Sequence, residues 1–253
     1  MNRIVMTALP GLPHVKPGDD VAAMIVAASE DCEEPLQDGD VVVVAQKIIS
    51  KAEGRTVALR DVAPDARALE LAVRCQKDPR QIAVVLDQSA EVLRARPGVI
   101  IVALHNGMVL ANAGVDRSNV EGGNDDTVLL LPSDPDASAE ALRRALKVRT
   151  GADVGVIIAD SIGRAWRLGT VGTAIGAAGV VCRADLRGRP DLYGRPLETT
   201  EVGAADELAA AASILMGQAA EGFPVVVIRG AGYLMGEGRA TDLVRPVAMD
   251  MFR

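Results

Sequence analysis

The chain has 253 residues, of which 49% are hydrophobic and 2% aromatic, and its formal net charge is −7 at pH 7. This length and apolar content can bury a substantial core, which excludes a largely disordered protein. The negative charge argues against a nucleic-acid or anionic-membrane surface, since both need clustered Lys and Arg, and the shortage of aromatic residues removes stacking platforms for single strands. We expect small-molecule chemistry.

The cysteines and the apolar runs indicate the cellular setting. Cys32, Cys75 and Cys182 are far apart and show no CxxC spacing, so neither a disulfide framework nor a thiolate zinc site is predicted. Residues 1–10 contain no stretch typical of a signal peptide, and charge, Gly or Pro interrupts every apolar run before about 18 residues. A cytoplasmic protein with no membrane partner is expected.

Short apolar runs in chain order predict buried strands, and amphipathic stretches between them predict helices. Asp19 is expected to cap a first helix, Ser133-Asp134-Pro135 to open a second, and Ala205 to Met216 to form a third. With no repeat and no linker, residues 1–253 are expected to form a single domain of mixed α/β class. The predicted strands are Val41 to Ala45, Ile82 to Leu86, Val99 to Leu104, Val128 to Leu131, Val154 to Ala159 and Val225 to Arg229.

Two long polar segments, Asn106 to Asp126 and Arg183 to Thr200, are expected to be loops that frame a site. Common signatures are missing: there is no GxxxxGK[ST] loop, and no GxGxxG follows the first predicted strand. The two histidines, His14 and His105, have no serine or cysteine arrangement around them, which leaves a Ser-His-Asp hydrolase without support.

The octapeptide from Asp160 to Arg167 begins where the apolar run Val154 to Ala159 ends. Asp160 and Ser161 at the end of a buried strand can face one crevice, and their oxygens suit Mg²⁺ or Mn²⁺. Arg164 and Arg167 add planar donors for phosphate or carboxylate groups. The alternative is that Asp160 and Ser161 only cap the following turn and that both arginines are solvated.

A second acid, Asp116, lies in a Gly-containing turn and is a candidate to join Asp160 around one cation, because two carboxylates with phosphate oxygens hold magnesium well. The alternative is an Asx turn between Asp116 and Ser118. After the strand Val41 to Ala45, two lysines occur four residues apart, Lys47 and Lys51. Lys51 is a candidate for phosphate binding, although a lysine at such a position is often only solvated surface.

Six motifs in this order and spacing resemble the CofE family, the ligases that add γ-linked glutamate to the deazaflavin coenzyme F-420. The similarity covers nearly the whole chain. The motifs are Gly11-Leu12-Pro13, Asp38-Gly39-Asp40, Ser50-Lys51-Ala52-Glu53-Gly54, Ala113-Gly114-Val115-Asp116-Arg117-Ser118-Asn119, Asp160 to Arg167 and Val225 to Gly230.

The resemblance implies a ligase that uses GTP, free L-glutamate and two divalent ions, Mg²⁺ or Mn²⁺, with K⁺ as a further candidate ion. It also implies an α/β fold with mixed sheets and an intertwined homodimer. Asp116 and Asp160 would bind one metal, Ser161 and Gln218 the second, and Lys51 would assist phosphoryl transfer beside the two aspartates. The implied nucleotide contacts are Leu12, Pro13, His14, Val15, Gln46, Lys51, Asn119, Met216, Gly217, Gln218, Ala219, Ala220, Glu221, Gly222 and Phe223.

The chain departs from the family pattern at three of these positions. His14 stands where Glu is frequent, Gln46 where Ser is common, and Ser161 where Thr is frequent, so the hydroxyl is kept only at the last. Some actinobacterial relatives continue into a flavin-binding nitroreductase-like domain, and the stand-alone form is expected here.

The implied reaction phosphorylates a carboxylate of the precursor and then lets the glutamate amine displace phosphate. Two other classes of function remain open on the residues alone. A metal-dependent nucleotide phosphohydrolase or small-molecule kinase would use the same aspartates, and a noncatalytic protein would bind the nucleotide without turning it over.

Overall fold

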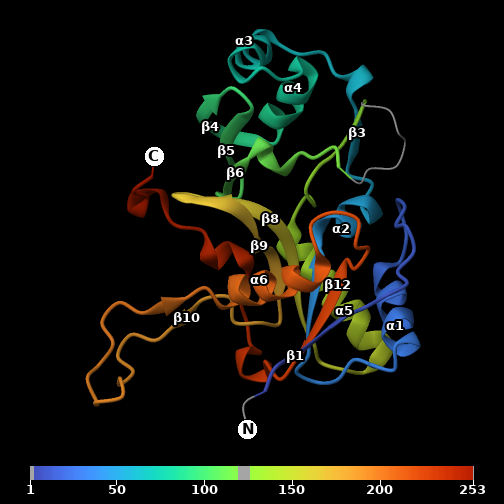
Figure 1. Ribbon diagram of the computed structural model, residues 1–253, viewed down its shortest axis with the longest axis vertical. Coiled ribbons are helices and arrows are strands. Elements are labelled where there is room, and N and C mark those ends of the chain that lie inside the picture. The colour runs from blue at the N-terminus through green and yellow to red at the C-terminus, as the bar shows by residue number, and fades with distance from the viewer. Residues whose placement is uncertain (1–2, 119–125, 253) are drawn as a thin grey trace.

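The computed structural model describes residues 3–118 and 126–252. Its centre is a mixed sheet with the strand order β1-β12-β2-β8-β9 (Figure 1). β2 and β8 run parallel, while the other neighbouring pairs are antiparallel. The mixed α/β class predicted from the sequence is confirmed. The strands are β1 (Val5–Ala8), β12 (Val225–Arg229), β2 (Val41–Ala45), β8 (Gly155–Arg164) and β9 (Arg167–Ala178).

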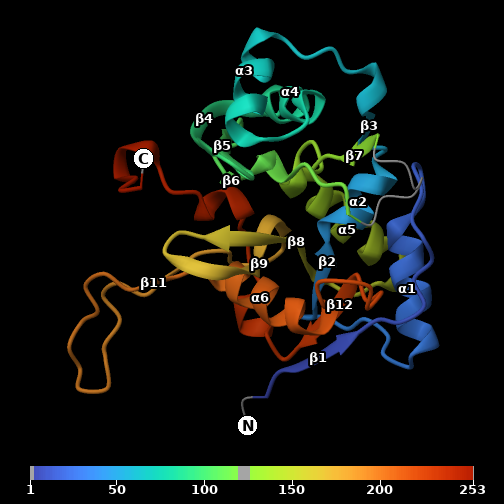
Figure 2. The same cartoon turned by 45° about the horizontal axis from the view of Figure 1, so that its top comes forward.

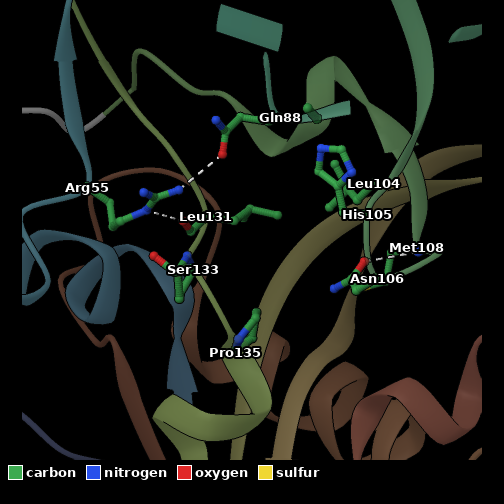
Figure 3. A pocket seen from close by; sticks show the side chains of 11 residues that line it. Arg55, Gln88, Leu104, His105, Asn106, Met108, Leu131, Ser133 and Pro135 are labelled. Carbon is green, nitrogen blue, oxygen red and sulfur yellow. Dashed lines mark hydrogen bonds between the residues drawn. The ribbon is translucent and has the colours of Figure 1, made fainter. Parts of the chain in front are cut away.

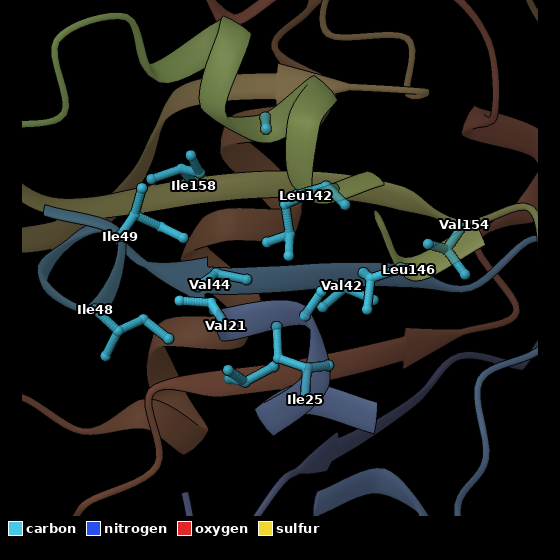
Figure 4. Close-up of a cluster of buried hydrophobic side chains, with 14 of the residues drawn as sticks. Val21, Ile25, Val42, Val44, Ile48, Ile49, Leu142, Leu146, Val154 and Ile158 are labelled. Carbon is cyan, nitrogen blue, oxygen red and sulfur yellow. The ribbon is translucent and has the colours of Figure 1, made fainter. Parts of the chain in front are cut away.

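Helices cover both faces of this sheet, which explains why the central strand β2 is apolar at every position. Successive residues of a strand point to opposite faces, so Val42 and Val44 enter one core while Val41 and Val43 enter the other. The first core lies under α1 (Val21–Asp31), α2 (Gln46–Ala52) and α5 (Pro135–Thr150), and the second under α6 (Ala204–Met216). Figure 4 shows ten labelled members of the first core: Val21, Ile25, Val42, Val44, Ile48, Ile49, Leu142, Leu146, Val154 and Ile158.

The three predicted helices are present, with one shifted cap. Asp20, not Asp19, caps α1 by accepting a hydrogen bond from the backbone N–H of Ala23 at 3.0 Å. Asp19 instead accepts from the backbone N–H of Lys16. At α5 the predicted opening is confirmed, because Asp134 is the cap and the following proline occupies the first turn, where its missing N–H costs nothing.

The chain between α2 and α5 builds a smaller unit at the top of Figure 1, with an apolar cluster of its own. Leu104 packs against both this cluster and the first core, so the two are joined. The elements are β3 (Thr56–Ala58), α3 (Ala66–Cys75), α4 (Pro79–Asp87), β4 (Ser89–Arg96), β5 (Val99–Leu104), β6 (Val109–Ala111) and β7 (Thr127–Leu129). Short 3-10 turns lie at η1 (Leu59–Asp61), η2 (Asn112–Gly114), η3 (Gly232–Leu234), η4 (Ala240–Leu243) and η5 (Val247–Met249).

Two predictions on the elements are wrong. The segment Ile82 to Leu86 belongs to helix α4, because Asp78 caps a helix that begins at Pro79 and the buried Ile82 and Val85 share one helical face. The predicted strand Val154 to Ala159 does not stop before Asp160. It continues to the tip of a hairpin with β9, so the octapeptide is strand and tight turn.

Two arms extend from the main sheet in Figures 1 and 2, the β8–β9 hairpin and the loop between β10 (Ala184–Asp185) and β11 (Glu201–Val202). The second arm holds most of the predicted polar loop Arg183 to Thr200 and projects away from the body, so it does not frame a site within this chain. Large apolar side chains are exposed on both arms: Trp166 and Leu168 on the hairpin, and Leu192 and Tyr193 on the second. Among the described helices, none combines the length and apolar character needed to cross a membrane.

Candidate active site

Several predicted site segments leave the main sheet at one edge, where β2 ends and β12 begins. Leu9, directly after β1, donates its backbone N–H to the carbonyl of Val225 at 2.9 Å, and Ala45 at the end of β2 donates to Pro224 at 2.8 Å. Ala159 of β8 lies beside Ala45 in the parallel pair. Ligands of open α/β sheets bind outside the carboxyl ends of strands. The segments that emerge here are 9–15, 46–52, 216–224 and the part of β8 that begins at residue 160.

The side chain of Asp116 is held at this edge by contacts from two elements. Lys47, in the first turn of α2, places Nζ 2.6 Å from Asp116 Oδ2 and 2.5 Å from Ser118 Oγ. The Asp116 carboxylate also accepts from the backbone N–H and the hydroxyl of Ser118, at 2.8 and 2.7 Å. The predicted alternative, an Asx turn with Ser118, is therefore present, and the ion pair with Lys47 accompanies it.

Asp160 is the second carboxylate of this site, and its environment differs from that of Asp116. Burial raises the pKa of Asp160, the Ser161 backbone N–H and the Lys47 charge act in the opposite direction, and the Asp116 charge raises it further. For Asp116, burial also works to raise the pKa, but hydrogen bonds from Lys47 and Ser118 bring it below the ordinary value. The fold thus brings the two predicted aspartates into one electrostatic cluster around Lys47.

This cluster has the chemistry of a cation site, since Lys47 pairs with Asp116 and its charge also lowers the pKa of Asp160. A divalent ion held by two carboxylates completes its shell with waters and phosphate oxygens. In residues 3–118 and 126–252, no three His, Cys, Asp or Glu side chains gather as a metal-binding group, so the protein ligands here would be Asp116 and Asp160. The residues present fit one such ion.

The predicted ligands of a second ion, Ser161 and Gln218, are not among the residues that contact Asp116. Ser161 follows Asp160 within β8, opposite Gly172 of β9, and consecutive strand residues point to opposite faces. Ser161 is exposed and does not share the side of Asp160, so the predicted common crevice is not formed by this strand. Gln218 is also exposed, in the loop between α6 and β12.

The predicted nucleotide contacts lie on three of the converging segments, with unequal exposure. Within Leu12 to Val15, Pro13 and His14 are exposed while Val15 is buried in the first core. Gln46 is buried, and its Oε1 accepts from Ser50 Oγ at 2.8 Å, so much of its side chain serves α2 itself. Lys51 is half-buried one turn after Lys47 on the same helix face.

The loop 216–223 connects α6 to β12 and is largely exposed. Gly217 has φ +71°, and a Cβ there would meet the Glu221 side chain at 2.2 Å, so this glycine lets the loop fold back on itself. The Glu221 carboxylate accepts the backbone N–H of Ala219 at 2.8 Å. Asn119, the remaining predicted contact, lies outside the described residues.

Sequence analysis missed the role of Lys47 and a cluster of charges beside Asp116. Lys47 and Lys51 share the i, i+4 spacing that places both on one helix face, a signal that could have singled out both. Asp78 binds Arg80 at 2.8 Å and Arg117 at 3.4 Å, and the Arg80 hydrogen bond lowers the pKa of Asp78 to about 2. Asp78 and Arg117 are 39 residues apart, so no local pattern predicts their contact.

Arg164 and Arg167, the predicted phosphate or carboxylate donors, flank the turn of the β8–β9 hairpin and are exposed. Trp166 between them has φ +63°, and its ring lies 6.3 Å from that of Phe252, centroid to centroid. Neither arginine lies among the contacts of the Asp116 carboxylate described above. Both arginines could therefore bind a ligand only at the tip of the hairpin.

Comparison with known proteins identifies relatives along nearly the whole chain. Residues 11–230 match the family model described as F420-0:Gamma-glutamyl ligase. A protein named Coenzyme F420:L-glutamate ligase from Methanothermobacter thermautotrophicus is 46% identical over 252 residues, covering 99% of both chains. Proteins of the same name from Methanocaldococcus jannaschii and Archaeoglobus fulgidus are 43% and 45% identical, covering 96% and 99% of this chain and 94% and 97% of their own.

The family match spans both cores, the Lys47, Asp116 and Asp160 cluster, and the converging segments from residue 11 onward. Each match spans nearly the full length of both chains, so the similarity includes the smaller unit and both arms. The chain belongs to the F420-0:gamma-glutamyl ligase family.

Proposed function

We propose that this protein joins L-glutamate through a γ-linkage to the deazaflavin coenzyme precursor, at the expense of GTP. The observation that carries the proposal is the cluster in which Lys47 pairs with Asp116 and acts on the charge of Asp160, at the edge where the predicted nucleotide segments converge. The names of the full-length relatives specify coenzyme F420 and L-glutamate for those proteins. The same cluster and the same family support both substrates here.

The first step in the proposal activates the precursor. A carboxylate oxygen of the precursor attacks the γ-phosphorus of GTP, the bond between that phosphorus and the bridging oxygen breaks, and GDP leaves with the electron pair. Charge then accumulates on the phosphoryl oxygens. Lys47 and Lys51 lie on one face of α2, directly after β2, and would stabilise that charge.

The second step forms the amide bond. The glutamate nitrogen attacks the carbonyl carbon of the acyl phosphate, the bond from that carbon to the phosphate oxygen breaks, and inorganic phosphate leaves. The nitrogen gives up its proton, so each cycle yields one amide, one GDP and one phosphate. The departing phosphate can accept that proton, so Asp160 can stay ionised as a metal ligand.

A divalent ion, Mg²⁺ or Mn²⁺, would be held by Asp116 and Asp160 and would supply charge neutralisation at the nucleotide phosphates. A second ion with Ser161 and Gln218 as ligands, and a K⁺ ion, remain part of the proposal. Both carboxylates must be ionised to bind such an ion, and the hydrogen bonds from Lys47 and Ser118 keep Asp116 in that form.

We also propose that two copies of the chain form a homodimer through the arms. Trp166, Leu168, Leu192 and Tyr193 are at least 86% exposed, although each is large and apolar. Exposed apolar side chains on protruding arms are typical of segments covered by a partner. A second copy offers the same surfaces, as a two-fold interface requires.

The test is an incubation of the purified protein with GTP, Mn²⁺, the precursor and L-glutamate, followed by mass spectrometry and nucleotide analysis. The ligase predicts a product heavier by one glutamate less one water, with one GDP formed per bond, none formed when the precursor is omitted, and no sustained GDP formation when only L-glutamate is omitted. GDP release that ignores both acceptors would support a phosphohydrolase, and transfer of phosphate to the precursor without glutamate incorporation would support a kinase. A GTP-dependent rise in melting temperature without any turnover would support a noncatalytic binding protein.

A further inference from the structure

A small cavity lies between the main body and the smaller unit, away from the predicted nucleotide segments (Figure 3). Arg55 and Leu131 approach it from one side, His105 and Asn106 from the other, and Pro135 at the start of α5 lies below them. Its volume is about 110 Å³. None of the residues predicted from the sequence to contact metal or nucleotide lines it.

The size of the cavity restricts what it can hold. Sites for drug-sized ligands and cofactors have volumes of roughly 300 to 1,000 Å³. At about 110 Å³ this cavity is too small for a nucleotide or a deazaflavin and matches a compact, amino-acid-sized molecule.

The one strongly basic group of the cavity is fixed in place by contacts that leave part of it available. Arg55 Nε donates to the carbonyl of Leu131 at 3.0 Å, and Nη2 donates to Gln88 Oε1 at 3.0 Å. Within the described part of the chain, Nη1 makes no hydrogen bond. A guanidinium tethered in this way loses little freedom when it pairs with a carboxylate, which is the ligand group its planar shape suits best.

The other polar groups around the cavity agree with a carboxylate. His105 and Asn106 are exposed and add donors opposite Arg55. Pro135 belongs to the first turn of α5, and the N-terminal end of a helix carries a positive partial charge. Glu53 is the acid to consider, but its carboxylate already accepts from the Ser138 hydroxyl and, at 3.4 Å, from the Ser133 backbone N–H.

The cavity is adjacent to the acidic cluster through two paired backbone segments. Asp116 and Leu129 exchange backbone hydrogen bonds of 3.0 and 2.8 Å, and Leu131, two residues beyond, forms part of the cavity wall. Two residues of extended chain span about 7 Å. The cavity wall therefore lies two residues along the chain from the backbone partner of Asp116.

We propose that this cavity is the site of the acceptor amino acid, with a carboxylate of L-glutamate paired with Arg55 and the amine directed toward Asp116 and Asp160. The inference rests on the proposed ligase function and adds a binding site to it. A carboxylate could also come from a glutamyl group on the coenzyme itself, and the kinetics of the two substrates separate these sources.

The test compares Arg55→Met and Arg55→Lys with wild type in steady-state ligation, with L-glutamate, the precursor and GTP each varied. Loss of a hydrogen bond to a charged group predicts a rise of about 10- to 100-fold in the KM for L-glutamate in Arg55→Met, with a smaller rise in Arg55→Lys. The KM values for GTP and precursor should change less than about twofold. Wild type should prefer L-glutamate over L-glutamine, and Arg55→Met should lose most of that preference.

Two further variants distinguish a loss of glutamate binding from a general loss of folding. His105→Ala removes an exposed side chain and should raise only the KM for L-glutamate, by a few-fold, at an unchanged melting temperature. Arg60→Met, which removes a guanidinium that is 75% exposed in the neighbouring η1 turn, should change none of the constants. The inference would be overturned if wild type ligates and both Arg55 variants keep the wild-type KM for L-glutamate. It would also be overturned if the variants raise only the KM for the precursor. Failure of wild type to ligate would instead overturn the proposed function.

Discussion

The ammonium group of Lys47 lies 2.6 Å from the carboxylate of Asp116, and its positive charge also lowers the pKa of Asp160, so one cation already acts on both predicted metal ligands. These residues come from α2, from the segment before β7 and from β8. A metal ion that enters this cluster must compete with Lys47 for Asp116. The displaced ammonium would then be available to the nucleotide phosphates.

Lys47→Met is expected to separate these two effects. Without the competing ammonium, Mn²⁺ should bind a few-fold more tightly in the absence of nucleotide, because a half-exposed ion pair contributes at most about 1 kcal/mol. The kcat of ligation should fall roughly 100-fold, the loss typical for a group that stabilises transferring charge. Calorimetric titration and steady-state kinetics measure both, and Lys147→Met, which removes a lysine paired with Asp153, serves as the control. Weaker Mn²⁺ binding together with unchanged kcat would contradict the role.

Asp116→Asn and Asp160→Asn should both abolish metal-dependent ligation but should shift metal-free stability in opposite directions. The pKa of Asp116 is lowered, so its ionised form stabilises the fold at any pH above the ordinary pKa of an aspartate. This stabilisation is lost as the pH falls through the lowered pKa. The pKa of Asp160 is raised, so ionisation costs stability as pH rises through that pKa. At neutral pH we expect a lower melting temperature for Asp116→Asn and a higher one for Asp160→Asn.

A pH series provides the control for this contrast. Protonated aspartate resembles asparagine, so both differences from wild type should shrink in acid, and that of Asp160→Asn should shrink first. Equal destabilisation by the two variants at every pH would contradict the described environments.

Gly114→Ala should disturb the segment that carries Asp116. Gly114 has φ +69°, and a Cβ there would lie 2.6 Å from Leu131 Cγ. Backbone strain and overpacking together should lower the free energy of unfolding by about 2 to 4 kcal/mol. Gly98→Ala is the matched control, because Gly98 has φ +84° with nothing within 4 Å of the added atom, and should lose only about 1 to 2 kcal/mol. Urea unfolding of both proteins checks the difference, and equal losses would show that Leu131 does not constrain this turn.

Leu192→Asp should weaken association through the second arm, where Leu192 is 99% exposed. A charge in a covered apolar contact is costly, so the dimer should dissociate at concentrations where wild type does not. Light scattering after size exclusion gives the masses. Val148→Asp, at a residue 87% exposed on α5, should leave the mass unchanged. A monomeric wild type, or equal masses for all three proteins, would count against the proposed dimer.

Local patterns in the sequence predicted the parts of the fold that local physics decides. The unbroken apolar run Val41 to Ala45 becomes a strand buried on both faces, and the Asp134-Pro135 pair opens α5. The run Ile82 to Leu86 was ambiguous, because a short apolar run suits a buried strand or one face of a helix, and the Asp78 cap with Pro79 decided for the helix.

The candidate site could be predicted only as separate pieces. Asp116 and Asp160 are recognisable from their motifs, but their approach to Lys47 depends on the bridge between Asp116 and Leu129 and on the parallel pairing of β2 with β8. The cavity at Arg55 has no motif at all, since it forms where the start of α5, the smaller unit and the segment just before β3 meet. A local sequence pattern cannot predict such contacts between distant parts of the chain.

The central claim is that Asp116 and Asp160 grip one metal ion beside the nucleotide, and a crystal structure with GDP and Mn²⁺ measured at the manganese absorption edge tests it most directly. The account predicts an anomalous peak within coordination distance, about 2.0 to 2.3 Å, of an oxygen from each carboxylate, with the Lys47 ammonium displaced from Asp116. A manganese peak elsewhere, with the ion pair between Lys47 and Asp116 intact, would contradict it.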